Sequence, residues 1–566
     1  MRLRRPHGLA LLAAALVAPM PAASQVPAVQ TPLEDFRLPP AEAPSPTPRE
    51  PILPPLPVPT PDDRLSGALR VQVREFRITG NTVFSDSELE PLLAPYTGRE
   101  ISSAEVQEAR QALTLFYVEH GYVNSGAVIP DQKVEDGVVE LRVVEGRLID
   151  VEVEGTRWFH PSYFEKRLMI DADLPLQIER LEERLQLLQQ DERIRRLNAR
   201  LGPGAERGQA VLRVRIEEAL PIDLGLEWAN DEPVSVGEQT GRIRLDVTNV
   251  TGFGDELRSV VALTEGLTDA RVRYRVPLNK WDTALEGRFR ISDSDIVEAP
   301  FDQLGFHSLT RTVGLGLSQP LYRTPSTDLE VAIFAEWRRS ETENDDGPIS
   351  FPGSGADPDT GETTISVLRL GGQWLQRTRT QVFALRSLAS VGLPVLGATL
   401  NSGNLPDSRF VSWLTQFQWV RRFPRIFDLE LVLRTDLQLS SAPLVPMEQI
   451  AVGGMHTVRG YRENQLVRDQ AVIGSLELRY PLWRSAGERH LIQLAPFVDS
   501  GHGWNRSRFT PDPKTITGIG AGLRYRFHRM LLAEIYYGAN LRDVFEGQEK
   551  SLQSRGISFR LRFDPL

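Results

Sequence analysis

The chain of 566 residues has no cysteine, and what it lacks excludes several classes of protein. Without thiols it can form no disulfide, no thiolate metal site and no cysteine nucleophile. Its formal net charge of -10 argues against a nucleic-acid-binding protein, which needs a concentrated basic surface. After the N-terminal segment there is no apolar run of about 18 residues, so we expect no membrane-spanning helix. Phosphate-binding loops and metal-ligand spacings are also missing, and we therefore expect no enzymatic activity, no cofactor and no metal.

Residues 1–24 are predicted to be a signal peptide. Arginines at the start precede an apolar run at 9–18 that is too short to span a bilayer, and Ala22, Ala23 and Ser24 suit a cleavage site. A disordered tail that is apolar by chance is the alternative. The order of charge, apolar run and small residues favours export from the cytoplasm.

Residues 25–67 are predicted to be a periplasmic linker, because 13 prolines lie between Pro27 and Pro61. Proline fixes φ and removes a backbone donor, so helix and sheet are excluded and an extended, semi-rigid spacer is expected. Docking of this segment to a proline-binding partner is the alternative.

A small α+β module is predicted at residues 68–147. A strand at Val71–Ile78 precedes a helix that opens at the capping box Ser102-x-x-Glu105 and ends at Gly121. Two further strands close the module.

Residues 148–218 repeat this order, with an amphipathic helix at 178–188 and a closing strand at 212–216. The two modules open on residues at the same offsets: Ile78, Gly80 and Phe84 in the first, and Val153, Gly155 and Phe159 in the second. Self-similarity with a period of about 75 residues indicates two copies of one fold.

Residues 219–566 change to a pattern of strands. In FDLELVLRTDLQL, Phe427 to Leu439, apolar and polar residues alternate, and similar alternation occurs at 242–247 and 519–527. Sixteen strands are expected, starting near residues 222, 240, 255, 268, 282, 309, 328, 364, 380, 409, 427, 471, 491, 517, 530 and 555.

A soluble sandwich or propeller and a transmembrane barrel would both bury one face of such strands. The connections distinguish them, because those after odd-numbered strands tend to be long and polar and those after even-numbered strands are usually tight. We therefore predict an all-β transmembrane barrel of 16 antiparallel strands in the bacterial outer membrane, with both modules in the periplasm. Four aromatic residues near strand ends are candidates for interfacial girdles, with scattered surface aromatics as the alternative: Trp281, Trp419, Trp483 and Tyr537.

Two short motifs lie within the predicted barrel. VRGY, in the sixth outward loop, comprises Val458, Arg459, Gly460 and Tyr461, and FVDSG places Phe497, Asp499 and Gly501 on one face of the thirteenth strand. The stretch FYVEHGYVNSGAVIPDQKVEDGVVELRVVEG, residues 116–146, resembles a polypeptide-transport-associated (POTRA) domain. Together these features resemble the two-partner secretion transporters, the haemolysin-activator and filamentous-haemagglutinin-transporter family.

The resemblance implies a pore that secretes one large exoprotein, haemolysin-like or adhesin-like, without ATP. The two POTRA domains would bind the unfolded client, and the sixth loop would fold into the lumen and pair Arg459 with Asp499. Further partners implied are outer-membrane lipids and lipopolysaccharide, and the barrel assembly machinery during biogenesis. Family members often carry an N-terminal helix that plugs the barrel, and the proline-rich linker shows no clear one.

Other interpretations of these residues compete with secretion. A barrel-assembly or insertion factor of the same superfamily is the runner-up, and a passive porin is disfavoured by the two modules. GIGAG, residues 518–522, resembles part of a dinucleotide loop, but it lies in a strand pattern without a following helix and suits a lumen wall. His456 is predicted to be a solvated loop residue. Without the motif context, Arg459 and Asp499 would be a solvated arginine and an ordinary lumen carboxylate.

Overall fold

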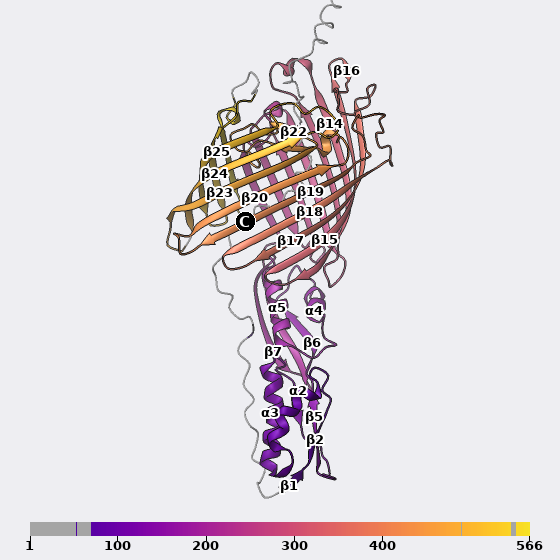
Figure 1. The fold of residues 1–566 in the computed structure, drawn as a ribbon, viewed down its shortest axis with the longest axis vertical. Helices are drawn as coiled ribbons and strands as arrows, with labels where there is room; N and C mark the ends of the chain where they lie inside the picture. Colours follow the sequence, from indigo (N-terminus) through magenta and orange to yellow (C-terminus); the bar gives the residue numbers. More distant parts are fainter. Residues whose placement is uncertain (1–52, 54–69, 488, 545–550, 566) are drawn as a thin grey trace, which may run out of the picture.

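The computed structural model describes residues 53, 70–487, 489–544 and 551–565. The predicted signal peptide lies outside these residues, as does the predicted linker apart from Leu53. The described residues form a column of two small α+β modules below a wide β-barrel (Figure 1). Within that part of the chain, none of the helices is long and apolar enough to cross a membrane.

The first module packs two helices on a three-stranded sheet of order β2-β5-β4, with a separate β1-β3 pair. Its elements are β1 (Arg70–Val73), β2 (Glu75–Thr79), α2 (Asp86–Leu93), η2 (Ala94–Tyr96), β3 (Arg99–Ser102), α3 (Ser103–Glu119), β4 (Gly126–Val128) and β5 (Val138–Val144). The capping box predicted at Ser102 opens α3, since Ser102 Oγ accepts from the Glu105 N–H and Glu105 accepts from the Ser102 N–H.

The strand predicted at residues 71–78 is divided at Arg74, and its halves belong to different sheets. The backbone N–H groups of Arg74 and Glu75 both donate to the carbonyl of Gly137, at 2.7 and 3.3 Å. Two successive donors that converge on one acceptor bend the chain, and sequence alternation does not report this bend.

The second module repeats the first. It contains β6 (Arg147–Glu154), α4 (Ser162–Leu168), α5 (Ile178–Gln189), β7 (Ile194–Pro203) and β8 (Gln209–Glu218), in a sheet of order β6-β8-β7. Leu53 is buried in its core.

The predicted repeat extends to individual glycines. Gly80 and Gly155 both have positive φ, and a Cβ at either position would collide with a carbonyl oxygen, that of Val143 or Ile216. Each module therefore needs glycine at the same place, where the first strand leaves the sheet.

The barrel is closed and antiparallel. It contains β9 (Ile222–Ala229), β10 (Thr240–Thr248), β11 (Glu256–Leu263), β12 (Leu267–Pro277), β13 (Ala284–Asp295), β14 (His307–Arg323), β15 (Thr327–Asn344), β17 (Glu362–Arg377), β18 (Gln381–Leu393), β19 (Val411–Phe423), β20 (Leu429–Ser440), β23 (Gln470–Arg484), β24 (His490–Trp504), β25 (Thr515–Phe527), β26 (Leu531–Asn540) and β27 (Ile557–Phe563). β27 pairs with β9 to close the ring, and the two-residue β16 (Gly347–Pro348) only extends β15. The prediction of a 16-stranded barrel is confirmed.

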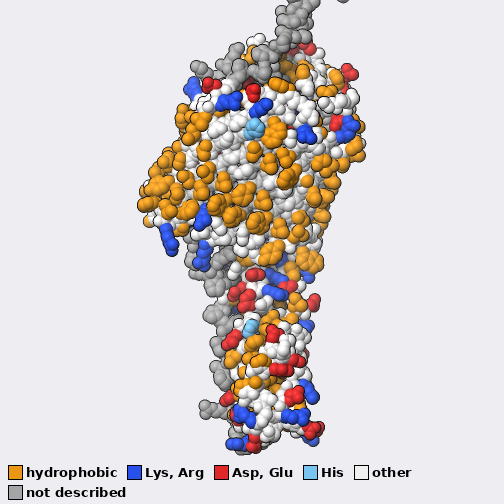
Figure 2. All heavy atoms as spheres, viewed as in Figure 1, with side chains coloured by type: hydrophobic (Ala, Val, Ile, Leu, Met, Phe, Trp, Pro, Cys, Tyr) orange, Lys and Arg blue, Asp and Glu red, His pale blue; other side chains and the backbone are white. Residues whose placement is uncertain are grey.

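The outer face of the barrel is apolar and its inner face is polar. On β14, Val313, Leu315 and Leu317 are 50, 58 and 42% exposed, whereas Thr310 and Thr312 are buried. Figure 2 shows such hydrophobic side chains as a belt around the barrel. Exposed leucines alternating with buried polar residues are what a barrel presents to lipid on one side and to its lumen on the other.

The lengths of the connections follow the predicted alternation of long and tight, except at one connection. In addition, one strand begins two residues later than predicted. The connection from β11 to β12 follows an odd-numbered strand but has only residues 264–266. The strand predicted from Phe427 begins at Leu429, because Phe427 and Asp428 have φ of 51° and 55° and form the turn. Apolar alternation continues through this left-handed turn and so cannot mark its end.

The second module docks directly on the periplasmic turns of the barrel. The His160 N–H donates to the carbonyl of Gly252 at 2.8 Å, and the Arg193 guanidinium donates to that of Gly254 at 2.6 Å. Arg167 forms an ion pair with Asp282 in the next turn. These contacts hold the module beneath the periplasmic end of the lumen.

Candidate functional site

The connection between β20 and β23, residues 441–469, folds into the barrel lumen. It contains η5 (Pro446–Glu448) and a small hairpin of β21 (Ile450–Val452) with β22 (Leu466–Arg468). Its apolar side chains form a cluster with the inner wall that includes Val452, Val458, Tyr461, Leu466, Ile473 and Ile516. This lumen loop therefore has a core of its own against the wall.

Arg459 of the VRGY motif is fixed by Asp499 of the FVDSG strand. The guanidinium donates from Nε to Asp499 Oδ2 at 2.7 Å and from Nη2 to Oδ1 at 2.9 Å, and the Arg459 backbone N–H donates to Oδ2 at 3.1 Å. Arg459 Nη1 donates to Glu477 on β23. A two-pronged bond between a guanidinium and a carboxylate fixes both distance and orientation.

The remaining surroundings of Arg459 are aromatic and closed to solvent. Its Cζ lies 3.7 Å from the ring centroid of Phe497 and 4.8 Å from that of Tyr536. Arg459 is 6% exposed and Asp499 is 1% exposed. A cation between a carboxylate and ring faces, away from water, interacts more strongly than a surface ion pair would.

Tyr461 and Gly460 bind the loop to the last strands. The Tyr461 hydroxyl lies 3.1 Å from the carbonyls of Thr517 and Arg542 and also accepts from the Arg542 N–H. Gly460 has φ of 94° and lies against the backbone of Gly538. The tip of the loop is thereby attached to β25 and to the end of β26.

Several glycines line the part of the barrel wall that contacts the lumen loop. A Cβ on Gly518 would overlap the Arg459 carbonyl oxygen, and one on Gly501 would lie 3.7 Å from Val452 Cβ and collide with its Cγ1. The GIGAG stretch lies on β25, and its glycines face the lumen loop and neighbouring aromatic rings. Glycine here permits the loop backbone to approach the wall closely.

Sequence reasoning missed a second anchor of the loop. Arg369 on β17 donates from Nη2 to Glu448 Oε1 at 2.6 Å and from Nη1 to Oε2 at 3.0 Å, and both residues are at most 1% exposed. Arg338 and Glu336 complete the cluster. Neither Glu448 nor Arg369 lies in a motif, and 79 residues separate them, so no sequence signal pairs them.

His456 lies in the lumen against the barrel wall, where its side chain is 27% exposed. Its Nε2 lies 3.3 Å from Asp231 Oδ2 and accepts from Arg560 Nη2 at 2.7 Å, in the lumen. The sequence predicted a solvated residue because His456 lies in a loop. Since this loop folds inward, His456 contacts the barrel wall.

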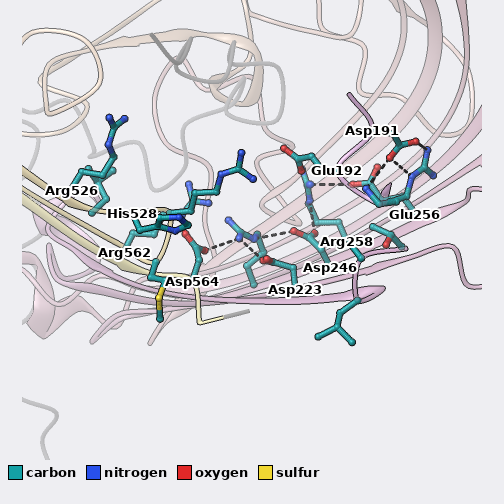
Figure 3. Close-up of a pocket in the computed structure, with 18 of the residues that line it drawn as sticks. Asp191, Glu192, Asp223, Asp246, Glu256, Arg258, Arg526, His528, Arg562 and Asp564 are labelled. Atoms are coloured by element: carbon teal, nitrogen blue, oxygen red, sulfur yellow. Dashed lines mark hydrogen bonds and ion pairs between the residues drawn. The ribbon is translucent and has the colours of Figure 1, made fainter. Parts of the chain in front are cut away.

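A cavity of about 1760 Å³ lies between the second module and the lumen (Figure 3). Its lining includes residues of α5 and the periplasmic ends of the strands, together with Met455, His456 and Arg459 of the lumen loop. We call this cavity the periplasmic vestibule. It connects the second module to the anchor of the loop.

Comparisons with known proteins agree with this architecture. The profile of the family described as haemolysin secretion/activation protein ShlB/FhaC/HecB matches residues 208–525, and that of the ShlB-type POTRA domain matches residues 71–146. The outer membrane transporter CdiB of Dickeya dadantii (strain 3937) is 22% identical over 470 residues, which cover 80% of this chain and 79% of CdiB. The heme/hemopexin transporter protein HuxB of Haemophilus influenzae (strain 86-028NP) is 21% identical over 467 residues, covering 77% of this chain and 78% of HuxB.

Solved structures share the fold. CdiB from Escherichia coli superposes with a TM-score of 0.65 at 20% identity, over 89% of this chain and 92% of that one. BamA from Haemophilus ducreyi, lacking POTRA domains 1–3, gives a TM-score of 0.55 at 15% identity, over 87% of this chain and all of that one. The family profile covers more than half of the chain, and the chain therefore belongs to the haemolysin secretion/activation protein family ShlB/FhaC/HecB, the two-partner secretion transporters of the outer membrane.

Proposed function

We propose that this transporter secretes a large haemolysin-like or adhesin-like exoprotein in unfolded form, without ATP and without catalytic chemistry of its own. The observation that carries the proposal is the periplasmic vestibule, whose lining combines residues of the second module with residues of the loop-filled lumen. A client held at the module is then already at the mouth of the pore. During biogenesis and function, the barrel would meet the barrel assembly machinery, outer-membrane lipid and lipopolysaccharide.

The modules offer sheet edges for capture of an extended client. In the second module the sheet order β6-β8-β7 leaves β6 and β7 at the edges, and in the first the edges are β2 and β4. An extended segment can add to such an edge through backbone hydrogen bonds, without the client being folded. Folding of the client outside the cell would then drive its transfer.

Transfer requires the lumen loop to leave its place, because residues 441–469 fill the path of the chain. The anchors at Arg459 and Glu448 are single side chains that bind different parts of the wall, β24 and β17, so the loop can detach while the strand ladders stay intact. We propose that VRGY and the Phe497, Asp499 and Gly501 face act as this reversible anchor.

A reversible lock tests the proposal. A Cβ at residue 501 would lie 3.7 Å from Val452 Cβ, within the usual range of about 3.5–4.5 Å for a disulfide. The chain has no other cysteine, so Val452→Cys with Gly501→Cys can form only this bridge within one molecule. Secretion of the exoprotein client is expected to stop in the oxidised double variant and to return with dithiothreitol.

The reduced double variant is the matched control, since it carries the same side-chain changes without the bridge. Val452→Cys alone is the second control; Gly501→Cys alone is not used, because its Cβ would collide with Val452 Cγ1 and displace the loop. Exoprotein in the medium is normalised to folded transporter. Secretion by the oxidised double variant at the level of the reduced double variant would show that the loop need not move and would overturn the mechanism.

Insertion of other barrel proteins is a second candidate function, favoured by the closure of this barrel. β27 and β9 share four registered pairs, whereas β26 and β27 share seven. A short seam is the place where a barrel could open to another strand. Depletion of the transporter separates the two functions: loss of many outer-membrane barrels supports insertion, and loss of one exoprotein supports secretion.

A further inference from the structure

The periplasmic vestibule is basic, although the chain as a whole is acidic. Eighteen arginines and one lysine line it, against eleven aspartates and glutamates, in a protein of net charge -10. The loop anchor does not require this excess, since Asp499 and Glu477 already balance Arg459. The excess is therefore a property of the cavity itself.

Nine of the eleven carboxylates that line the vestibule form ion pairs with arginines. Asp564 pairs with Arg244 and Arg562, and Asp246 pairs with Arg258 and with Arg244. Figure 3 shows Arg562, Asp564, Asp246 and Arg258 in a row across the view, with the Arg526 guanidinium pointing away from them. The internal ion pairs thus neutralise the acidic groups and leave cationic side chains toward the cavity.

Three of the cations lie at the mouth of the vestibule. Arg195 in β7, Arg526 at the end of β25 and Arg529 in the turn that follows are all exposed. They come from the second module and from the barrel, so they face the opening from both sides. A ligand arriving from the periplasm meets these residues first.

One outward connection of the barrel carries the opposite charge. Residues 341–362, at the outward end of β15 and the start of β17, contain seven carboxylates and no lysine or arginine. A polyanion would be attracted to the vestibule and repelled by this outward segment. This distribution of charge suits a site that binds an acidic segment at the periplasmic end and does not hold it at the outer end.

We propose that the periplasmic vestibule binds an extended polypeptide segment with a net negative charge. Guanidinium groups recognise carboxylates through paired hydrogen bonds, and a cavity with low-dielectric walls concentrates the field of its charges. The vestibule opens between the module and the barrel and not on the lipid-facing wall, which favours a peptide over a lipid head group. The inference rests on the proposed function only in naming the client as the source of the segment.

Peptide binding to the full-length protein in detergent tests the inference. The probe is a fluorescent, unstructured peptide of glutamates spaced by glycine and serine, and its partner carries lysine at every glutamate position. Anisotropy should show binding of the glutamate peptide, weakened by added salt, and no binding of the lysine peptide. Equal binding of both peptides would overturn the proposal.

A charge-neutralised variant locates the site. Arg195→Ser, Arg526→Ser and Arg529→Ser together should weaken binding on the order of tenfold, because each exposed pair contributes little alone. The matched control neutralises three exposed arginines at periplasmic strand ends and turns outside the vestibule lining, Arg377, Arg379 and Arg425. A heat-modifiable band on a gel shows that both variants are folded.

The outcomes are distinct. An equal loss in both triple variants would mean diffuse charge attraction and overturn the site. Binding of phosphatidylglycerol-containing micelles that the Arg195, Arg526 and Arg529 variant loses, with no binding of the glutamate peptide, would overturn the proposal and assign the vestibule to lipid head groups. None of these peptide experiments measures secretion. A negative peptide result would therefore not contradict the proposed function, and a negative result of the disulfide experiment would not contradict peptide binding in the vestibule.

Discussion

Removal of the Arg459 guanidinium should release the lumen loop while the barrel remains folded. Arg459→Ala leaves Asp499 and Glu477, which are 1% and 5% exposed, without their shared cation. Truncating one partner of a buried ion pair costs about 3–5 kcal/mol. The strand ladders do not involve this side chain, so the cost falls on the docked state of the loop.

Arg459 has two carboxylate partners, and this predicts which of the two single variants releases the loop more. In Asp499→Ala the arginine keeps Glu477, whereas in Arg459→Ala both carboxylates lose it, although Glu477 retains Arg479 and Arg524. Arg459→Ala should therefore have the larger effect. The double variant should be little worse than Arg459→Ala, because residues that act as one pair are not additive.

Maleimide labelling of Val452→Cys measures loop release, since Val452 is fully buried and the chain has no cysteine of its own. A cost of about 3 kcal/mol should raise the open population and the labelling rate on the order of a hundredfold. Arg213→Ala is the control, because it breaks an ion pair with Glu152 that is exposed on the second module. Unchanged labelling in both single variants, or fully additive effects in the double variant, would refute the anchor.

Three further predictions concern the wall and the modules. Gly518→Val should expel the loop by collision with the Arg459 carbonyl and raise the same labelling rate, whereas Gly474→Val, where a Cβ meets no atom within 4 Å, should not. Burial alone would raise the pKa of Glu145, but hydrogen bonds from Thr82 and Val83 outweigh it and hold the pKa below the ordinary 4.5. The contribution of these hydrogen bonds to the free energy of unfolding is present above pH 4.5 and is lost as pH falls. In urea denaturation of residues 70–218, the free energy of unfolding should therefore decrease less on acidification in Glu145→Gln than in the unaltered protein. A chain lacking residues 69–217 should form a barrel yet fail to pull down the client's secretion domain, and undiminished binding would place capture elsewhere.

The sequence by itself determined the elements whose signal is local. Alternation along β20 and β25 predicts strands, and the capping box at Ser102 predicts the start of α3, because both depend on neighbours within a few residues. The repeat of Gly80 and Gly155 was also readable, since each module needs glycine where the chain passes a carbonyl. The VRGY and FVDSG motifs became informative only through resemblance to a family.

Tertiary structure decided where those elements meet. Nothing local in the chain pairs Glu448 with Arg369, turns His456 toward Arg560, or gathers basic residues from α5 and seven or more strands around one vestibule. These relations depend on barrel closure and on a loop that turns inward, which bring together residues that are distant in sequence. An alternating pattern indicates which face of a strand is polar. The net charge of the vestibule is a sum over side chains from the whole ring of strands. This enclosed space, and therefore its charge, exists only once the ring has closed.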